Sequence, residues 1–105
     1  MKIEHTVETA YKVKLTFPAL LPITHTSPTW RVMELIESDT LCTTDYKDGG
    51  VAGIIDLTED QSKTEAVAFA LKCTLHGIAK EILESYPWTA EESAYLQQLA
   101  EATKP

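Results

Sequence analysis

Between Thr6 and Phe17 the residues alternate with a period of two, and this pattern constrains the fold more than any other feature. The positions of one set are Val7, Thr9, Tyr11, Val13, Leu15 and Phe17, and those between them are Thr6, Glu8, Ala10, Lys12, Lys14 and Thr16. A strand with this period has one face in the core and one face in water. The pattern is typical of an antiparallel sheet that helices cover on one side only. We therefore expect one long strand here.

Two helices are predicted in the C-terminal half. The sequence TEDQ from Thr58 to Gln61 has the pattern of a capping box, in which the first and fourth side chains bond each other's backbone N–H. An apolar stripe at helical spacing follows, and Pro87 ends the helix near Tyr86. A second capping box, TAEE from Thr89 to Glu92, predicts a shorter helix that extends to about Thr103.

The segment between these regions is ambiguous. Three prolines in residues 18–28 indicate an extended connection. Ser27 and Pro28 could then begin a helix that places Trp30, Met33 and Glu37 on one stripe. The many β-branched residues after position 31 favour the other interpretation, because such residues are enriched in strands. We expect two strands, at about residues 29–37 and 40–46.

Three glycines follow, at positions 49, 50 and 53, and raise the question of a phosphate-binding loop. Such a loop lies between a strand and the N-terminus of a helix. Here the strand-like sequence VAGIIDL (residues 51–57) follows instead, and no Lys-Ser or Lys-Thr pair is present after the glycines. The sequence KDGG is therefore predicted to form a hairpin turn, in which Gly49 or Gly50 has a positive φ.

Together these elements predict a single α+β domain spanning residues 1–105. It has an antiparallel sheet of three or four strands in the N-terminal half and two C-terminal helices packed on one face. A chain of 105 residues is long enough for one hydrophobic core. The N-terminal residues lack a signal-peptide pattern, and no apolar run approaches the ~20 residues that span a membrane. We expect a cytoplasmic protein with no membrane contact.

The formal net charge is −7, and the middle of the chain provides most of it. Residues 31–60 carry two basic and eight acidic side chains, a balance of −6. This field disfavours direct nucleic-acid binding and attracts basic protein surfaces. On the strand interpretation, Glu37 and Asp39 point to one side, roughly 6.7 Å apart. Glu34, Asp45 and Asp48 are predicted to extend this row, which could imitate phosphates. The candidate partner-binding carboxylates are therefore Glu34, Glu37, Asp39, Asp45 and Asp48.

The sequence Tyr86-Pro87-Trp88 lies where the two predicted helices meet. These aromatic side chains could fill the core at a corner of the chain. They could also be partly exposed and contact a partner, because Trp and Tyr are enriched at binding hot spots. Both interpretations remain open, and we include Tyr86 and Trp88 among the candidate partner-binding residues.

The cysteine and histidine residues give only a weak signal for chemistry. Cys73 and His76 share a helix face, and Cys42 with His25 or His5 would complete four metal ligands. However, no C-x-x-C motif supports a metal site, and Cys73 continues an apolar stripe. No G-x-S-x-G or other catalytic signature is present. We expect no metal, no cofactor and no catalytic residue.

Three functions remain. The leading hypothesis is a small acidic, non-enzymatic binding protein, an inhibitor or adaptor that docks on a basic protein surface such as a nucleic-acid-binding site. In its general type, though through no particular motif, such a chain resembles accessory proteins of phages and mobile elements that inhibit a host factor. One alternative is a small enzyme or ligand-binding subunit that uses the Cys and His residues. The other is a structural subunit that forms homodimers or larger oligomers through sheet edges or the helix pair.

Overall fold

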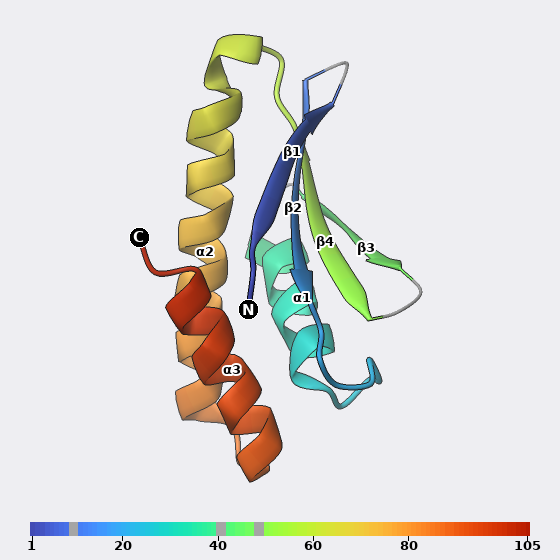
Figure 1. Cartoon of the computed structure of the whole chain (residues 1–105), viewed down its shortest axis with the longest axis vertical. Helices are drawn as coiled ribbons and strands as arrows, with labels where there is room; N and C mark the ends of the chain where they lie inside the picture. The colour runs from blue at the N-terminus through green and yellow to red at the C-terminus, as the bar shows by residue number, and fades with distance from the viewer. Residues whose placement is uncertain (9–10, 40–41, 48–49) are drawn as a thin grey trace.

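A computed structural model describes residues 1–8, 11–39, 42–47 and 50–105. The strands are β1 (Glu4–Glu8), β2 (Lys12–Pro18), β3 (Thr43–Lys47) and β4 (Val51–Leu57). The helices are α1 (Pro28–Asp39), α2 (Thr64–Ser85) and α3 (Ala90–Ala102), and a short 3-10 helix, η1 (Gln61–Lys63), leads into α2. The four strands form one antiparallel sheet in the order β1-β2-β4-β3 (Figure 1).

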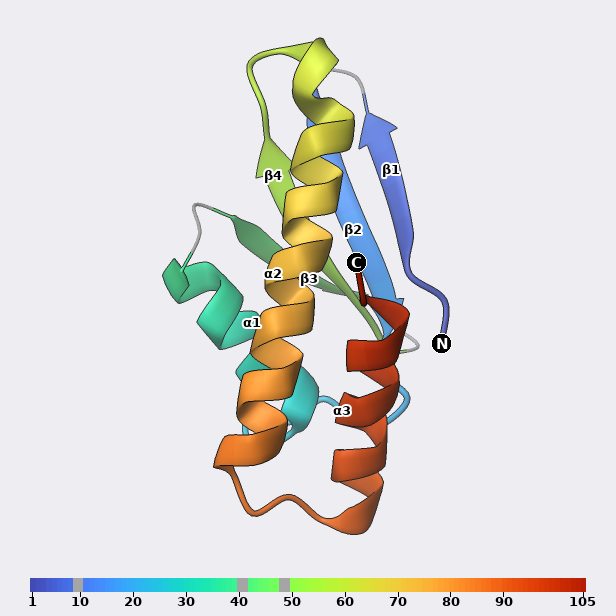
Figure 2. The ribbon, with the colours of Figure 1, turned by 90° about the vertical axis from the view of Figure 1, so that its left-hand side faces the viewer.

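All three helices cover the same face of this sheet (Figure 2). Helix α2 lies along the sheet, and α1 and α3 flank its C-terminal half. The inward residues of β2 (Val13, Leu15 and Phe17) are buried against the apolar sides of the helices. Among the described residues, no helix lies on the opposite face of the sheet (Figure 1). The predicted α+β fold, with two C-terminal helices packed on an antiparallel sheet, is confirmed. No helix in the described ranges combines the length and the apolar character needed to cross a membrane.

The prediction of one continuous strand over residues 6–17 is wrong. The chain turns back after Glu8, and β1 and β2 pair with each other, with Glu8 opposite Lys12 and Val7 opposite Val13. Tyr11, just before β2, has a φ of 58°. Three residues separate Glu8 from Lys12, so each residue of β1 pairs with a residue of β2 that is an even number of positions further along the chain. The alternation therefore continues through the turn, and the sequence TAY at residues 9–11 contains none of the usual turn residues.

The prediction of a strand at residues 29–37 is also wrong, because these residues belong to helix α1. Ser27 caps this helix: its hydroxyl oxygen accepts from the backbone N–H of Trp30 at 3.3 Å. Pro28 occupies the first helical turn, where its missing N–H costs nothing. The buried residues Thr29, Val32, Met33 and Ile36 follow the helical period. Burial of this stripe outweighs the weak strand preference of the β-branched residues.

The predicted hairpin between residues 47 and 51 is confirmed, because β3 pairs with β4 from Lys47 opposite Val51 onward. Gly50 has a φ of 78°, as a residue with no Cβ can adopt. Asp48 and Gly49 lie outside the described residues. The hairpin interpretation therefore holds over the phosphate-loop interpretation.

The two predicted caps have different outcomes. Thr89 and Glu92 form the predicted capping box at the start of α3. The box predicted at Thr58–Gln61 does not form: Asp60 caps η1 instead, and its carboxylate accepts from the backbone N–H of Ser62 at 2.9 Å. Because η1 comes first, α2 begins at Thr64 and ends, close to the predicted position, at Ser85.

Candidate functional site

A groove with a volume of about 500 Å³ lies at the end of the molecule where α1 begins and α2 connects to α3. We call it the aromatic groove. It combines aromatic rings with one cationic and one anionic side chain, and its lining residues are His25, Thr26, Ser27, Arg31, Tyr86, Pro87, Trp88 and Glu92. It therefore contains Tyr86 and Trp88, the two aromatic residues predicted from the sequence to contact a partner.

The connection between α2 and α3 fixes the positions of Tyr86 and Trp88 by hydrogen bonds. Tyr86 is extended, as a residue before proline prefers, and its carbonyl accepts from the backbone N–H of Trp88 at 2.9 Å. The indole Nε1–H of Trp88 donates to the carbonyl of Ile82 at 2.7 Å, and its ring packs against the core. Tyr86 remains 39% exposed. Trp88 thus supports the core and Tyr86 stays partly exposed, while the contact of either ring with a partner stays a prediction.

Glu92 forms the α3 side of the groove, and its position is fixed by helix capping. Its carboxylate accepts from the backbone N–H of Thr89 at 3.0 Å, while its own N–H donates to the Thr89 hydroxyl at 3.2 Å. A negative side chain in the first turn of a helix is favoured by the helix dipole. The carboxylate is therefore held in the groove without needing a ligand.

On the α1 side, Arg31 is the side chain that reaches across to the α2–α3 corner. Its guanidinium lies over the Tyr86 ring, with 5.0 Å between Cζ and the ring centroid, and Nη2 donates to the Tyr86 hydroxyl. Its Nη1 donates to Glu34 Oε2 at 3.3 Å. The Tyr86 hydroxyl, and then the Glu34 carboxylate, raise the pKa of Arg31, so the guanidinium stays charged.

An acidic ridge on α1 continues from the groove towards β3. It consists of Glu34 and Glu37, which lie almost one turn apart, and both are exposed. Glu37 accepts from the Thr44 hydroxyl. Trp30, on the same side of α1, stacks on Tyr46 with ring centroids 5.8 Å apart. Burial, and then the charges of Glu37 and Glu34, raise the pKa of Tyr46.

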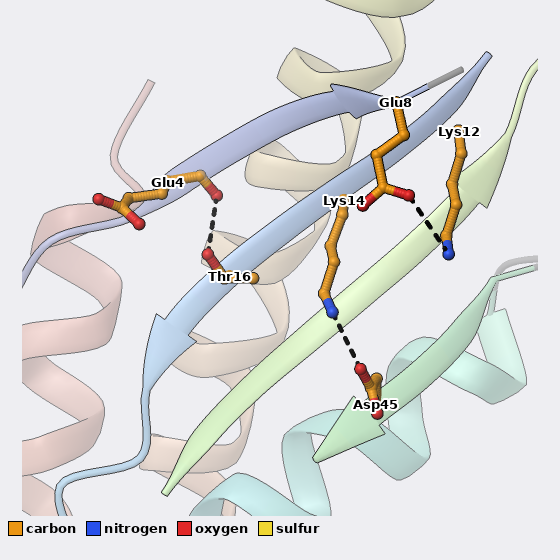
Figure 3. A network of polar contacts seen from close by, with 6 residues as sticks. All are labelled: Glu4, Glu8, Lys12, Lys14, Thr16 and Asp45. Carbon is orange, nitrogen blue, oxygen red and sulfur yellow. Dashed lines mark hydrogen bonds and ion pairs between the residues drawn. The ribbon is translucent and has the colours of Figure 1, made fainter. Parts of the chain in front are cut away.

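The row of carboxylates predicted from the strand interpretation does not form. In a helix, residues two apart point to nearly opposite sides, so Glu37 and Asp39 do not share a face. Asp45 projects from the helix-free face of the sheet, where its carboxylate pairs with Lys14 at 2.9 Å (Figure 3). Asp48 lies outside the described residues. Of the predicted carboxylates, Glu34 therefore contacts the groove residue Arg31, and Glu37 follows it along α1. Their contact with a partner stays a prediction.

Cys42, His76 and His25 each have a local contact in the fold. Cys42 is buried, with its thiol 3.7 Å from the Asp56 carboxylate. His76 Nδ1 lies 2.7 Å from the carbonyl of Ala100 and so links α2 to α3. His25 packs edge-on against Trp30 at a ring-centroid distance of 4.5 Å. Within the residues that the structure describes, no group of three or more His, Cys, Asp and Glu is arranged to hold a metal ion.

Sequence reasoning missed the central residue of this site. Arg31 was counted only as a charge, although its spacing of three from Glu34 is typical of an ion pair on a helix. That signal depended on recognising a helix at residues 28–39. The contact of Arg31 with Tyr86 spans 55 positions in the sequence, so only the tertiary structure could reveal it.

Comparison with known proteins gives no match: no family model fits this sequence, and no curated protein or solved structure is significantly similar to it. Inference about function therefore rests on the chemistry of the aromatic groove and the acidic ridge.

Proposed function

We propose that this chain is a non-enzymatic binding protein, an inhibitor or adaptor, that docks on a basic protein surface through the aromatic groove and the acidic ridge. The single observation that carries this proposal is the shared location of Tyr86, Trp88 and Glu34 at one end of the molecule. Two neighbouring Tyr and Trp rings, one exposed and one partly buried, are typical of the centre of a binding site, and charged side chains are typical of its rim.

Charge supports a basic partner. The whole chain carries −7, and Glu34, Glu37 and Glu92 outnumber Arg31 in and beside the groove. Carboxylates at the rim of an interface mainly increase the association rate, and salt screens them over about 8 Å at physiological ionic strength. A partner surface that normally binds nucleic acid carries suitable lysine and arginine side chains. Such a partner implies a cytoplasmic site of action, which forms part of the same proposal.

The test combines affinity capture from a lysate of the native host with a pair of charge-reversal variants. The first variant, Glu34→Lys with Glu37→Lys, reverses the acidic ridge. The second, Glu59→Lys with Glu101→Lys, makes the same charge change at exposed positions away from the groove. We expect the wild type and the second variant to retain the same protein at low salt, and the first variant to lose it.

A retained protein must also bind more slowly to the first variant when both are purified, with thermal melts nearly unchanged. Equal capture and equal association rates for the two variants would contradict the proposal. Failure of the wild type to retain any protein at low salt would contradict it as well. Trp88 is unsuitable for this comparison, because its indole is bonded to Ile82 and its removal would weaken the fold.

A further inference from the structure

Arg31 is the single arginine of the chain, and the groove holds its guanidinium in a defined site. The components of this guanidinium site are the face of the Tyr86 ring, the Tyr86 hydroxyl and the Glu34 carboxylate. An aromatic face below a planar cation, with a carboxylate at its edge, is a general arrangement for recognising arginine.

The match between Arg31 and this site is incomplete. Its Nε–H is buried and has no hydrogen-bond partner among the described residues, which is unfavourable for a donor on a charged group. The side chain as a whole is 38% exposed, and an ion pair at such exposure contributes little to stability. Movement of the guanidinium into solvent would hydrate Nε at small cost. The contact of Arg31 with Tyr86 and Glu34 is therefore easily exchanged.

The position of Arg31 also opposes the proposed partner. A basic surface approaching the groove would meet a like charge directly over Tyr86, the more exposed of the two aromatic rings. Because the Arg31 guanidinium already covers this face of the Tyr86 ring, a second guanidinium cannot stack on the same face. Either the partner avoids this part of the groove, or Arg31 leaves it when the partner binds.

We infer that Arg31 occupies the site at which an arginine of the partner binds, and this inference rests on the proposed function. Docking then exchanges the guanidinium of Arg31 for that of the partner. The incoming arginine stacks on Tyr86 and donates to its hydroxyl and to Glu34, while Arg31 moves into solvent. A lysine ammonium fits less well, because it has no planar face to stack and no fork of donors to bridge the hydroxyl and the carboxylate.

Because the chain has one arginine, its Nε–Hε gives a single resonance in a nitrogen–proton NMR spectrum, and this resonance reports directly on the site. The probes are acetylated tri-arginine amide and acetylated tri-lysine amide at matched ionic strength. We expect the arginine peptide to shift the Arg31 resonance and to speed its exchange with water, as the buried N–H becomes solvated. The lysine peptide should produce a smaller change at the same concentration.

Removal of the resident guanidinium provides a second measurement. Apparent affinity scales with the fraction of molecules whose site is open, so if Arg31 occupies the site in about nine molecules of ten, Arg31→Ala should bind tri-arginine about tenfold more tightly. The matched control is Lys63→Ala, which removes one positive charge in η1, next to the end of α2 that lies far from the groove. Arg31→Gln serves in place of Arg31→Ala if the alanine variant does not fold.

The outcomes separate this inference from the proposed function. If tri-arginine shifts backbone resonances of the groove but leaves the Arg31 side chain unchanged, the exchange is overturned and the proposed function survives. If Lys63→Ala tightens binding as much as Arg31→Ala, net charge explains the gain, and the exchange is again overturned. If neither the wild type nor Arg31→Ala binds either peptide up to millimolar concentration, the inference and the basic-partner proposal both fail.

Discussion

Lys14 on β2 reaches across β4 and pairs with Asp45 on β3, with 2.9 Å between Nζ and Oδ2 (Figure 3). The two strands do not touch, because β4 lies between them. The side chain of Lys14 passes over Gly53, which lies opposite Asp45 in the pairing of β3 with β4. This route buries most of Lys14 although it lies on the helix-free face. One ion pair thus connects β2 and β3 across the strand between them.

We predict that this pair makes stability depend on pH in acid. Lys14 lowers the pKa of Asp45, first by its hydrogen bond and then by its charge. A carboxyl group whose pKa is lowered on folding stabilises the fold above its ordinary value of 3.8. That contribution is lost as the pH falls through the lowered value. The free-energy difference of unfolding between the wild type and Asp45→Asn should therefore shrink below about pH 4.

Urea unfolding at several pH values measures this difference, with Lys14→Met as the background for a control. In that background the substitution Asp45→Asn should have a nearly constant effect. A difference between wild type and Asp45→Asn that stays the same from about pH 7 down to about pH 2 would disprove the linkage. At alkaline pH the same pair acts through Lys14, because the hydrogen bond with Asp45 raises the pKa of Lys14. The contribution of Lys14 to the free energy of unfolding is therefore lost only as the pH rises through that raised pKa.

A second prediction concerns Gly53. A Cβ at this position would lie 2.9 Å from Cε of Lys14, so one of the two must move. The lysine side chain is flexible and will yield, which separates it from Asp45. We expect Gly53→Ala to raise the pKa of Asp45, measured from its carboxyl carbon by NMR. The control is Gly77→Ala, whose new Cβ meets nothing within 4 Å. An unchanged Asp45 titration in Gly53→Ala would show that Lys14 does not depend on the glycine.

A third prediction concerns Tyr95, whose hydroxyl joins three elements in the core. It donates to the carbonyl of Pro18 at 3.1 Å and accepts from the hydroxyl of Thr29 at 3.2 Å. Burial raises its pKa to about 12. Tyr95→Phe leaves the buried Thr29 hydroxyl and the partly buried Pro18 carbonyl without this partner, and should cost about 1–3 kcal/mol. Thermal unfolding should show a fall of about 4–8 °C for each kcal/mol.

The matched control for this substitution is Tyr11→Phe, because Tyr11 is 41% exposed. Its melting temperature should stay close to that of the wild type. Equal melting temperatures for Tyr95→Phe and Tyr11→Phe would mean that the buried hydroxyl does not hold α3 against the end of β2.

A fourth prediction is that two glycine-to-alanine substitutions have opposite signs. Gly50→Ala should destabilise the protein by about 1 kcal/mol, because a φ of 78° is unfavourable for a residue with a Cβ. Gly77→Ala should stabilise it by about 1 kcal/mol, since alanine is the better residue in the middle of an exposed helix face and the space is open. Equilibrium unfolding of both variants provides the check, and a stabilising Gly50→Ala would contradict the positive-φ turn.

Local signals in the sequence determined much of this fold. Capping located the start of α3, Pro87 located the end of α2, and the glycine pair located the β3–β4 hairpin. These features depend on residues that are close together in the chain, so a single sequence contains their physical cause. The predicted position of Tyr86 and Trp88 between two helices followed from Pro87 for the same reason.

Tertiary structure decided what local pattern could not. Residues 28–39 carry both helix and strand signals, and the burial of Val32 and Ile36 against α2 and the sheet selected the helix. The β1–β2 turn was hidden because the period of two continues through a three-residue connection. The alternation of faces in β3 places Asp45 on the helix-free side of the sheet, away from the acidic ridge on α1. The contact between Arg31 and Tyr86 forms only because α1 packs against α2. A charge total is a property of the sequence, but the surface on which charges meet depends on contacts between distant residues.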